Sequence, residues 1–105
     1  MIRDKSDKAV LEAVDEALLV LGEGVRDAVY YHIQRNYQLR REEIPERLEA
    51  FHEVLLSLFG GGANVIEKLI VNKLYNRLDL GFEEHENWTI VDYVNHAKKS
   101  TSGAD

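Results

Sequence analysis

The sequence predicts an all-α fold, a compact bundle-like domain of about five helices with a central fourth helix. Apolar residues recur every three or four positions in five segments, which is the periodicity of a helix with one buried face. Helix-forming residues dominate between glycines, and the chain has a single proline. A length of 105 residues with 45% hydrophobic residues suits one core. We therefore expect one domain over residues 1–99 and a disordered tail over residues 100–105.

The first helix is expected to follow a cap at Ser6 or Asp7, with apolar residues at helical spacing from Val10. The second is expected from the glycines at 22–24 to Tyr37. Residues 1–7 are interpreted as a lead-in to the first helix. Gly22 is expected to end that helix, because glycine accepts a left-handed backbone at low cost. The connection is so short that the two helices should be antiparallel neighbours or a sharply bent pair.

The third helix is expected to have Pro45 in its first turn and to end at Phe59. Proline suits the first turn of a helix because its missing N–H costs nothing there. Leu48, Phe51 and Leu55 then follow at helical spacing. These residues predict one buried face for the third helix.

The fourth helix is expected over residues 63–78, after the glycine triplet at 60–62. Val65, Val71 and Tyr75 broaden its apolar stripe, so it should be the most hydrophobic helix all round and the central one. The triplet is interpreted as a helix cap and hinge, because it lacks the lysine of a P-loop and no clear strand precedes it. Anion binding by the triplet is the alternative.

The fifth helix is expected from about Thr89 to Lys99. Thr89 followed by Asp92 approximates a capping box at its start. Gly81 is expected to cap the preceding helix, and a short strand over residues 80–82 would have no strand to pair with.

Charge and composition exclude several classes of protein. The formal net charge is −6, which repels phosphate backbones and lowers the expectation of nucleic-acid or anionic-membrane binding. The chain has no cysteine, so it has neither disulfides nor thiolate sites. The start of the sequence shows no apolar run long enough for a signal peptide or a membrane span. A cytoplasmic location is therefore expected.

The sequence contains no residue set that spells out a reaction. No two histidines are three or four residues apart, so no helix presents a ready pair of metal ligands. The four histidines, interpreted as solvated side chains, are His32, His52, His85 and His96. Ser57 has no nucleophile-elbow motif around it. We therefore expect a non-enzymatic protein without catalytic, cofactor-binding or metal-binding residues.

Two surface sets remain as candidate binding sites. A small basic patch consists of Arg35, Arg40 and Arg41, but the acidic run that follows would largely cancel its field. The fourth and fifth helices carry more apolar residues than one narrow stripe needs, and the surplus can be core or an interaction surface. The candidate interaction surface consists of Val65, Leu69, Val71, Tyr75, Trp88, Val91 and Tyr93.

Three stretches of the sequence, residues 16–33, 39–75 and 88–94, resemble the Nitrosopumilus output domain, a family of small helical archaeal domains. The resemblance extends over about residues 11–99. It implies a signalling or regulatory role, because the family occurs alone and as a terminal module of signalling proteins. No catalytic residues are assigned to the family. Gln38 departs from the pattern, which is expected to have glycine there.

Three functions follow as hypotheses. The first is a non-enzymatic regulatory module that acts through protein–protein contacts, as a homodimer through the fourth and fifth helices. The second is a small-molecule sensor whose aromatic pocket is lined by Tyr30, Tyr31, Phe51 and Trp88. The third is weak nucleic-acid binding through the basic patch.

Overall fold

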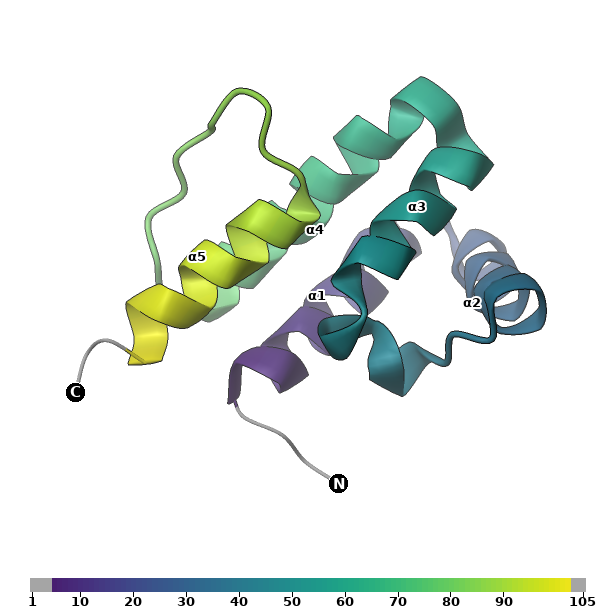
Figure 1. Ribbon diagram of the computed structural model, residues 1–105, viewed down its shortest axis with the longest axis horizontal. Helices are drawn as coiled ribbons and strands as arrows, with labels where there is room; N and C mark the ends of the chain where they lie inside the picture. The colour runs from purple at the N-terminus through teal and green to yellow at the C-terminus, as the bar shows by residue number, and fades with distance from the viewer. Residues whose placement is uncertain (1–4, 103–105) are drawn as a thin grey trace.

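The computed structural model describes residues 5–102 of the chain and confirms the all-α fold. These residues form five α-helices and two short 3₁₀ turns, and they contain no strand (Figure 1). The elements are α1 (Lys5–Leu21), α2 (Glu23–Tyr37), η1 (Arg41–Glu46), α3 (Leu48–Phe59), η2 (Gly60–Gly62), α4 (Ala63–Arg77) and α5 (Ile90–Ser102). The Cα radius of gyration is 13.1 Å, close to the value of about 13 Å for a compact domain of this size.

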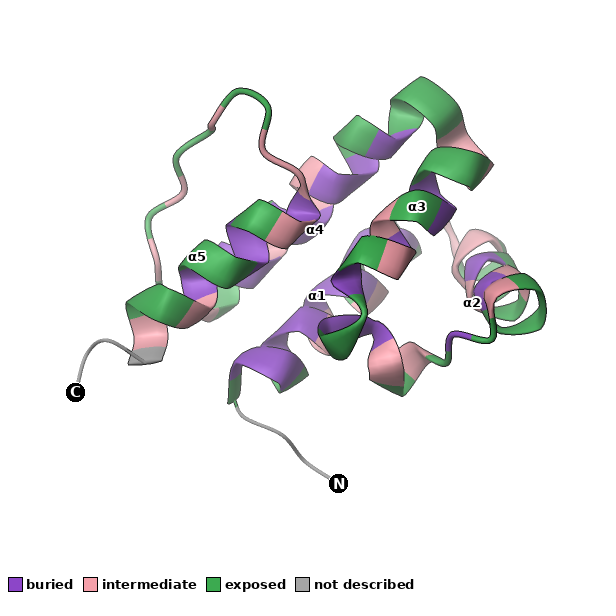
Figure 2. Ribbon diagram, in the orientation of Figure 1, coloured by how far each residue is buried: buried purple, intermediate pink, exposed green. Residues whose placement is uncertain are grey.

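The fourth helix is central, as predicted, and it shares that place with α1. Helix α4 packs along α1 and also contacts α3 and α5, while α1 contacts α2, η1 and α5. Figure 2 shows buried residues gathered where α1, α4 and α5 face one another. Ala13 and Ala17 of α1 are fully buried, and their small side chains let neighbouring helices approach closely. Helix α4 is not apolar all round as predicted, because Asn64, Asn72 and Asn76 occupy its exposed face.

Helix α1 begins earlier than predicted. Residues 5–7 are helical, and Ser6 and Asp7 are buried. The C-terminal helix covers this turn: Lys98 Nζ lies 2.9 Å from Asp7 Oδ1, and Ser6 Oγ lies 3.3 Å from Thr101 Oγ1. The predicted lead-in is therefore wrong from residue 5 onward, because a distant segment orders it. Its first four residues lie outside the described part of the chain.

The predicted tail is also partly wrong. Helix α5 continues through Ser102, and its later turns pack against the start of α1. Residues 103–105 lie outside the described part. The contact between the two ends of the chain explains the added helical turn, since tertiary packing supplies much of the stability of a short helix.

Helix α2 ends in a left-handed residue at Gln38, which has φ 50°. This is the position at which the family pattern is expected to have glycine. The Gln38 N–H donates to the carbonyl of Gln34 and the Leu39 N–H to that of Ile33, at 3.1 and 3.2 Å. Gln38 Nε2 also donates to the Arg35 carbonyl at 3.2 Å. Glutamine thus adopts the conformation for which glycine is preferred.

Pro45 lies in η1 and not in the first turn of α3, so its predicted place is wrong. Arg47 leaves the helical backbone between them, with φ −127° and ψ 51°, and α3 begins at Leu48. Ile44 and Pro45 are both buried, and η1 contacts α1. Burial of this apolar pair anchors a separate turn before α3.

The chain turns back between α3 and α4 at the glycine turn, Gly60–Gly62 (Figure 1). Gly60 is the C-cap of α3 and has φ 56°, so the predicted cap is confirmed. Its N–H donates to the Leu56 carbonyl. A residue with a side chain would be strained there.

Alanine at Gly60 is expected to lower the free energy of unfolding by about 1–2 kcal/mol, because of the left-handed backbone. Alanine at Gly61, which has open space and no positive φ, is expected to raise it by about 0.5 kcal/mol by restricting the unfolded chain. Urea denaturation of both variants measures the difference. Equal effects at the two positions would contradict this account of the turn.

One helical segment of the described residues, Leu48–Arg77, is long and apolar enough to cross a membrane by length and composition alone. Core helices of soluble proteins pass the same test. The segment folds back at the glycine turn, and Phe51 and Leu55 before it and Ile70 and Leu74 after it are buried. Its apolar character therefore matches the core that it helps to form.

Helix α4 ends at Arg77, four residues before the predicted cap at Gly81. Asp79 has a left-handed backbone, with φ 58°. Its N–H donates to the Asn76 carbonyl at 3.2 Å, and the Leu80 N–H donates to the Tyr75 carbonyl at 2.9 Å. This is the pair of hydrogen bonds of a Schellman motif, so the last carbonyls of α4 are satisfied without glycine.

The predicted capping interaction at the start of α5 is confirmed. The Thr89 N–H donates to Asp92 Oδ2 at 2.9 Å, and the Val91 N–H donates to Thr89 Oγ1 at 3.2 Å. Each bond satisfies a backbone donor at this end of the helix.

Candidate functional site

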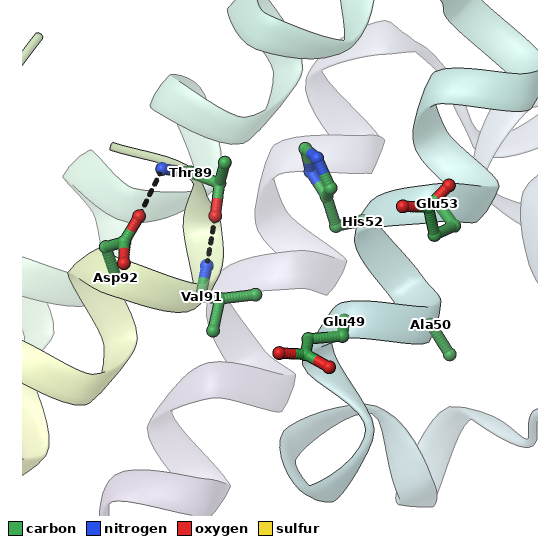
Figure 3. A pocket seen from close by; sticks show the side chains of 7 residues that line it. All are labelled: Glu49, Ala50, His52, Glu53, Thr89, Val91 and Asp92. Atoms are coloured by element: carbon green, nitrogen blue, oxygen red, sulfur yellow. Dashed lines mark hydrogen bonds between the residues drawn. The ribbon is translucent and has the colours of Figure 1, made fainter. Parts of the chain in front are cut away.

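A cleft of about 460 Å³ separates α3 from the start of α5. Figure 3 shows side chains of α3 on one side of it and those around the first turn of α5 on the other. The residues that line it are Glu49, Ala50, His52, Glu53, Thr89, Val91 and Asp92. With three carboxylates in its lining, the cleft favours cationic groups over anionic ones.

A buried carboxylate, Glu67 of α4, joins the helices beside this cleft. Glu67 is 5% exposed. His52 Nδ1, on α3, lies 2.5 Å from its Oε2, and the Ile90 N–H at the start of α5 donates to its Oε1 at 3.1 Å. One side chain therefore connects three helices. The interpretation of His52 as a solvated side chain is wrong.

The sequence contains a signal for Glu67, which is absent from the predicted site residues. Glu67 stands four residues after Ala63 and three before Ile70, on the apolar stripe of α4. A carboxylate on a buried stripe needs hydrogen-bonding partners, because burial of an unpaired charge is costly. Which residues supply those partners depends on the packing of α3 and α5.

A second polar cluster joins α1 to α2 and η1. Asp15 of α1 accepts hydrogen bonds from Tyr30 Oη at 2.5 Å and from Arg41 Nε at 3.1 Å, and it also pairs with Arg41 Nη2. These bonds fasten α2 and η1 to α1. Burial raises the pKa of Asp15, but the bonds from Arg41 and Tyr30 outweigh it, so the pKa lies below its ordinary value.

The predicted basic patch does not form one surface of free charges. Arg41 pairs with Asp15. Arg35 is exposed beside Tyr31, with its guanidinium carbon 6.0 Å from the ring centroid. Arg40 is exposed, and its backbone N–H donates to Glu43 Oε1 at 2.9 Å. The structure thus leaves Arg35 and Arg40 exposed and uses Arg41 as a structural contact.

The candidate interaction surface divides into core and surface residues. Val71, Tyr75 and Tyr93 are buried and belong to the core, so their assignment to a surface is wrong. Leu69, Trp88 and Val91 are half-buried. Val65 is the most exposed of the set, at 68%.

The aromatic pocket predicted from Tyr30, Tyr31, Phe51 and Trp88 does not form. Phe51 has no exposed surface, whereas Tyr31 is 64% exposed. Tyr30 is engaged with Asp15, and Trp88 stacks on His85 in the connection before α5.

A different aromatic cluster surrounds the connection between α4 and α5. Tyr93 Oη accepts the His85 N–H at 2.8 Å and lies 3.1 Å from the His85 carbonyl, to which it donates. Tyr75 Oη donates to the Tyr93 carbonyl at 2.7 Å. The ring of Phe82 lies edge-on to that of Tyr75, with centroids 5.6 Å apart. The connection is therefore fixed by aromatic side chains of α4 and α5. The His85 ring itself stacks on Trp88, with centroids 3.9 Å apart, so it is not a free solvated side chain.

The turn between α3 and α4 exposes apolar side chains. We call Leu56, Phe59, the glycine turn and Val65 the apolar tip. Leu56 is 42% and Val65 68% exposed, and Phe59 is half-buried. Figure 2 shows the turn as exposed, at the upper right of the view. Residues 54–66 include no Asp, Glu, Lys, Arg or His, although 30% of the whole chain is charged.

Comparison of the chain with family models, curated proteins and solved structures finds no match. The resemblance to the Nitrosopumilus output domain therefore stays a prediction from the sequence. Functional assignment rests on the geometry of the chain itself.

Proposed function

We propose that the protein is a non-enzymatic regulatory module that works by protein–protein contact, and that its partner at the apolar tip is a second copy of the chain. The exposure of uncharged apolar side chains at the tip carries this proposal. The sequence resemblance to a signalling-associated domain supports the regulatory role.

The fold does not need the exposed side chains of the tip. Phe51, Val54 and Leu55 already fill the inner face of α3, and each is fully buried. Leu56 and Val65 point outside that core, where exposed apolar surface is costly unless a partner covers it. Burial of such a side chain contributes about 1.5–3 kcal/mol.

Charge favours a second copy at the tip. Two chains that each carry a net charge of −6 repel each other on average, but the uncharged residues 54–66 let them approach there. A second exposed apolar group, at the end of α1, lies between Glu16 and Glu23 in the sequence. It consists of Leu19, Val20 and Leu21. A two-fold axis at the tip would bring the same apolar patch of the two copies together, so that each patch covers the other.

Light scattering after size exclusion, at micromolar concentration, is expected to give twice the chain mass of 12.1 kDa. The double variant Leu56→Lys with Val65→Lys is expected to weaken dimerisation at least about 100-fold, because four buried apolar side chains are lost across the two-fold axis.

The matched control is Ser57→Lys with Asn64→Lys, which adds the same charge at exposed neighbouring positions and keeps the apolar side chains. The control should remain more dimeric than the test variant. Monomer mass for the unmodified chain at all concentrations would overturn the proposal. Binding of the unmodified chain to lipid vesicles without dimer formation would assign the tip to a membrane instead.

A further inference from the structure

An aromatic pocket of about 300 Å³ lies where the connection before α5 meets α4 and α5. It is lined by Tyr75, Gly81, Glu83, His85, Trp88 and His96. Its volume is at the lower end of the range of about 300–1,000 Å³ that is usual for small-molecule sites. Four of the six lining residues carry rings, so the pocket is suited to a small ligand that binds to ring faces.

Fixed neighbours position the rings. Tyr75 and His96 are nearly parallel, with an interplanar angle of 10° and centroids 6.4 Å apart. The Trp88 centroid lies 5.7 Å from that of His96 and 3.9 Å from that of His85. Tyr75 is 3% exposed and its hydroxyl is bonded to the Tyr93 carbonyl, so it supports the pocket from the core side.

The charge around the pocket is negative. Glu83, whose side chain is 87% exposed, lies at the pocket with Oε1 3.9 Å from His85 Nε2. Neither lysine nor arginine lines the pocket. Ring faces carry partial negative charge and attract cations, most strongly in the case of Trp.

We propose that this aromatic pocket binds a small quaternary ammonium compound, with its methyl groups against the rings of Trp88 and His96 and its charge near the Glu83 carboxylate. A quaternary ammonium ion has no N–H group and cannot donate hydrogen bonds. It is recognised instead by ring faces and by the charge of a carboxylate. A metal ion fits less well: residues 5–102 include no group of three or more His, Cys, Asp or Glu side chains that could hold one. The inference is independent of dimerisation at the apolar tip.

Calorimetric titration of the full chain with tetramethylammonium, choline and glycine betaine tests the proposal. We expect saturable binding of at least one of them with a dissociation constant of about 1 mM or lower. Trp88 is the only tryptophan of the chain, so its fluorescence should change with the same midpoint. The neutral tert-butyl analogue of choline should bind at least about tenfold more weakly, since it lacks the charge.

His96→Ala is expected to weaken binding about tenfold and Glu83→Gln about threefold. Both residues are exposed, so the fold should tolerate the changes, and circular dichroism checks this. Glu86→Gln, at an exposed carboxylate that does not line the pocket, is the matched control and should bind as the unmodified chain does. Absence of saturable binding, equal binding of the neutral analogue, or no effect of His96→Ala would each overturn the proposal.

Discussion

Replacement of Glu67 by alanine is expected to lower the free energy of unfolding by about 3 kcal/mol. The carboxylate is 5% exposed and is bonded to His52 of α3 and to the Ile90 N–H of α5. Its loss would leave the Ile90 donor without an acceptor inside the protein, leave His52 without its partner, and create a cavity. Urea denaturation at neutral pH, followed by far-ultraviolet circular dichroism, measures the effect.

Two further variants separate the loss of the charge from the loss of the side chain, and a buried carboxylate from an exposed one. Glu67→Gln keeps the shape and an acceptor for the Ile90 N–H but loses the charge, so its effect should be smaller, at about 1–2 kcal/mol. Glu53→Ala removes an exposed carboxylate that lines the cleft between α3 and α5, beside Glu67. Its effect on the free energy of unfolding should stay within about 0.5 kcal/mol. Losses of equal size in Glu67→Ala and Glu53→Ala would show that Glu67 does not join the helices as described.

Replacement of Asp15 by alanine is expected to lower the free energy of unfolding by about 2 kcal/mol. Asp15 accepts bonds from Tyr30 of α2 and Arg41 of η1, and alanine would release both elements from α1. Asp27→Ala is the matched control, since Asp27 pairs with the adjacent Arg26 while its side chain is 67% exposed. That exposed pair should contribute less than about 0.5 kcal/mol.

The contribution of Asp15 to the free energy of unfolding should also depend on pH. Its pKa in the folded protein lies below the ordinary value of 3.8, because the bonds from Arg41 and Tyr30 outweigh the effect of burial. A carboxyl with a lowered folded pKa stabilises the protein fully above its unfolded pKa, and that stability is lost as the pH falls through the folded value. The difference in free energy of unfolding between the unmodified chain and Asp15→Asn should therefore be constant near neutral pH and shrink below about pH 4. A difference that grew toward acid would contradict the lowered pKa.

The sequence was a good guide to the candidate site where a residue's environment is local. The cap at Gly60 and the capping interaction of Thr89 with Asp92 both depend on neighbours within a few residues, and both are confirmed. The sequence pattern marks Val65 as surplus apolar surface, and it is exposed. The pattern does not distinguish Val65 from Val71 and Tyr75, which are buried, because all three widen the same stripe.

The sequence by itself determined five helical segments, since three- and four-residue periodicity and helix-ending residues act within one segment. Only the tertiary structure decided which polar side chains meet. The partners of Glu67 lie 15 and 23 residues away, and Arg41 lies 26 residues from Asp15. Tertiary packing also stabilises the first turn of α1 and the last turns of α5, through the contact of Ser6 with Thr101. Such contacts depend on how whole helices pack, and the pattern of one segment carries no information about the face that a distant segment presents to it.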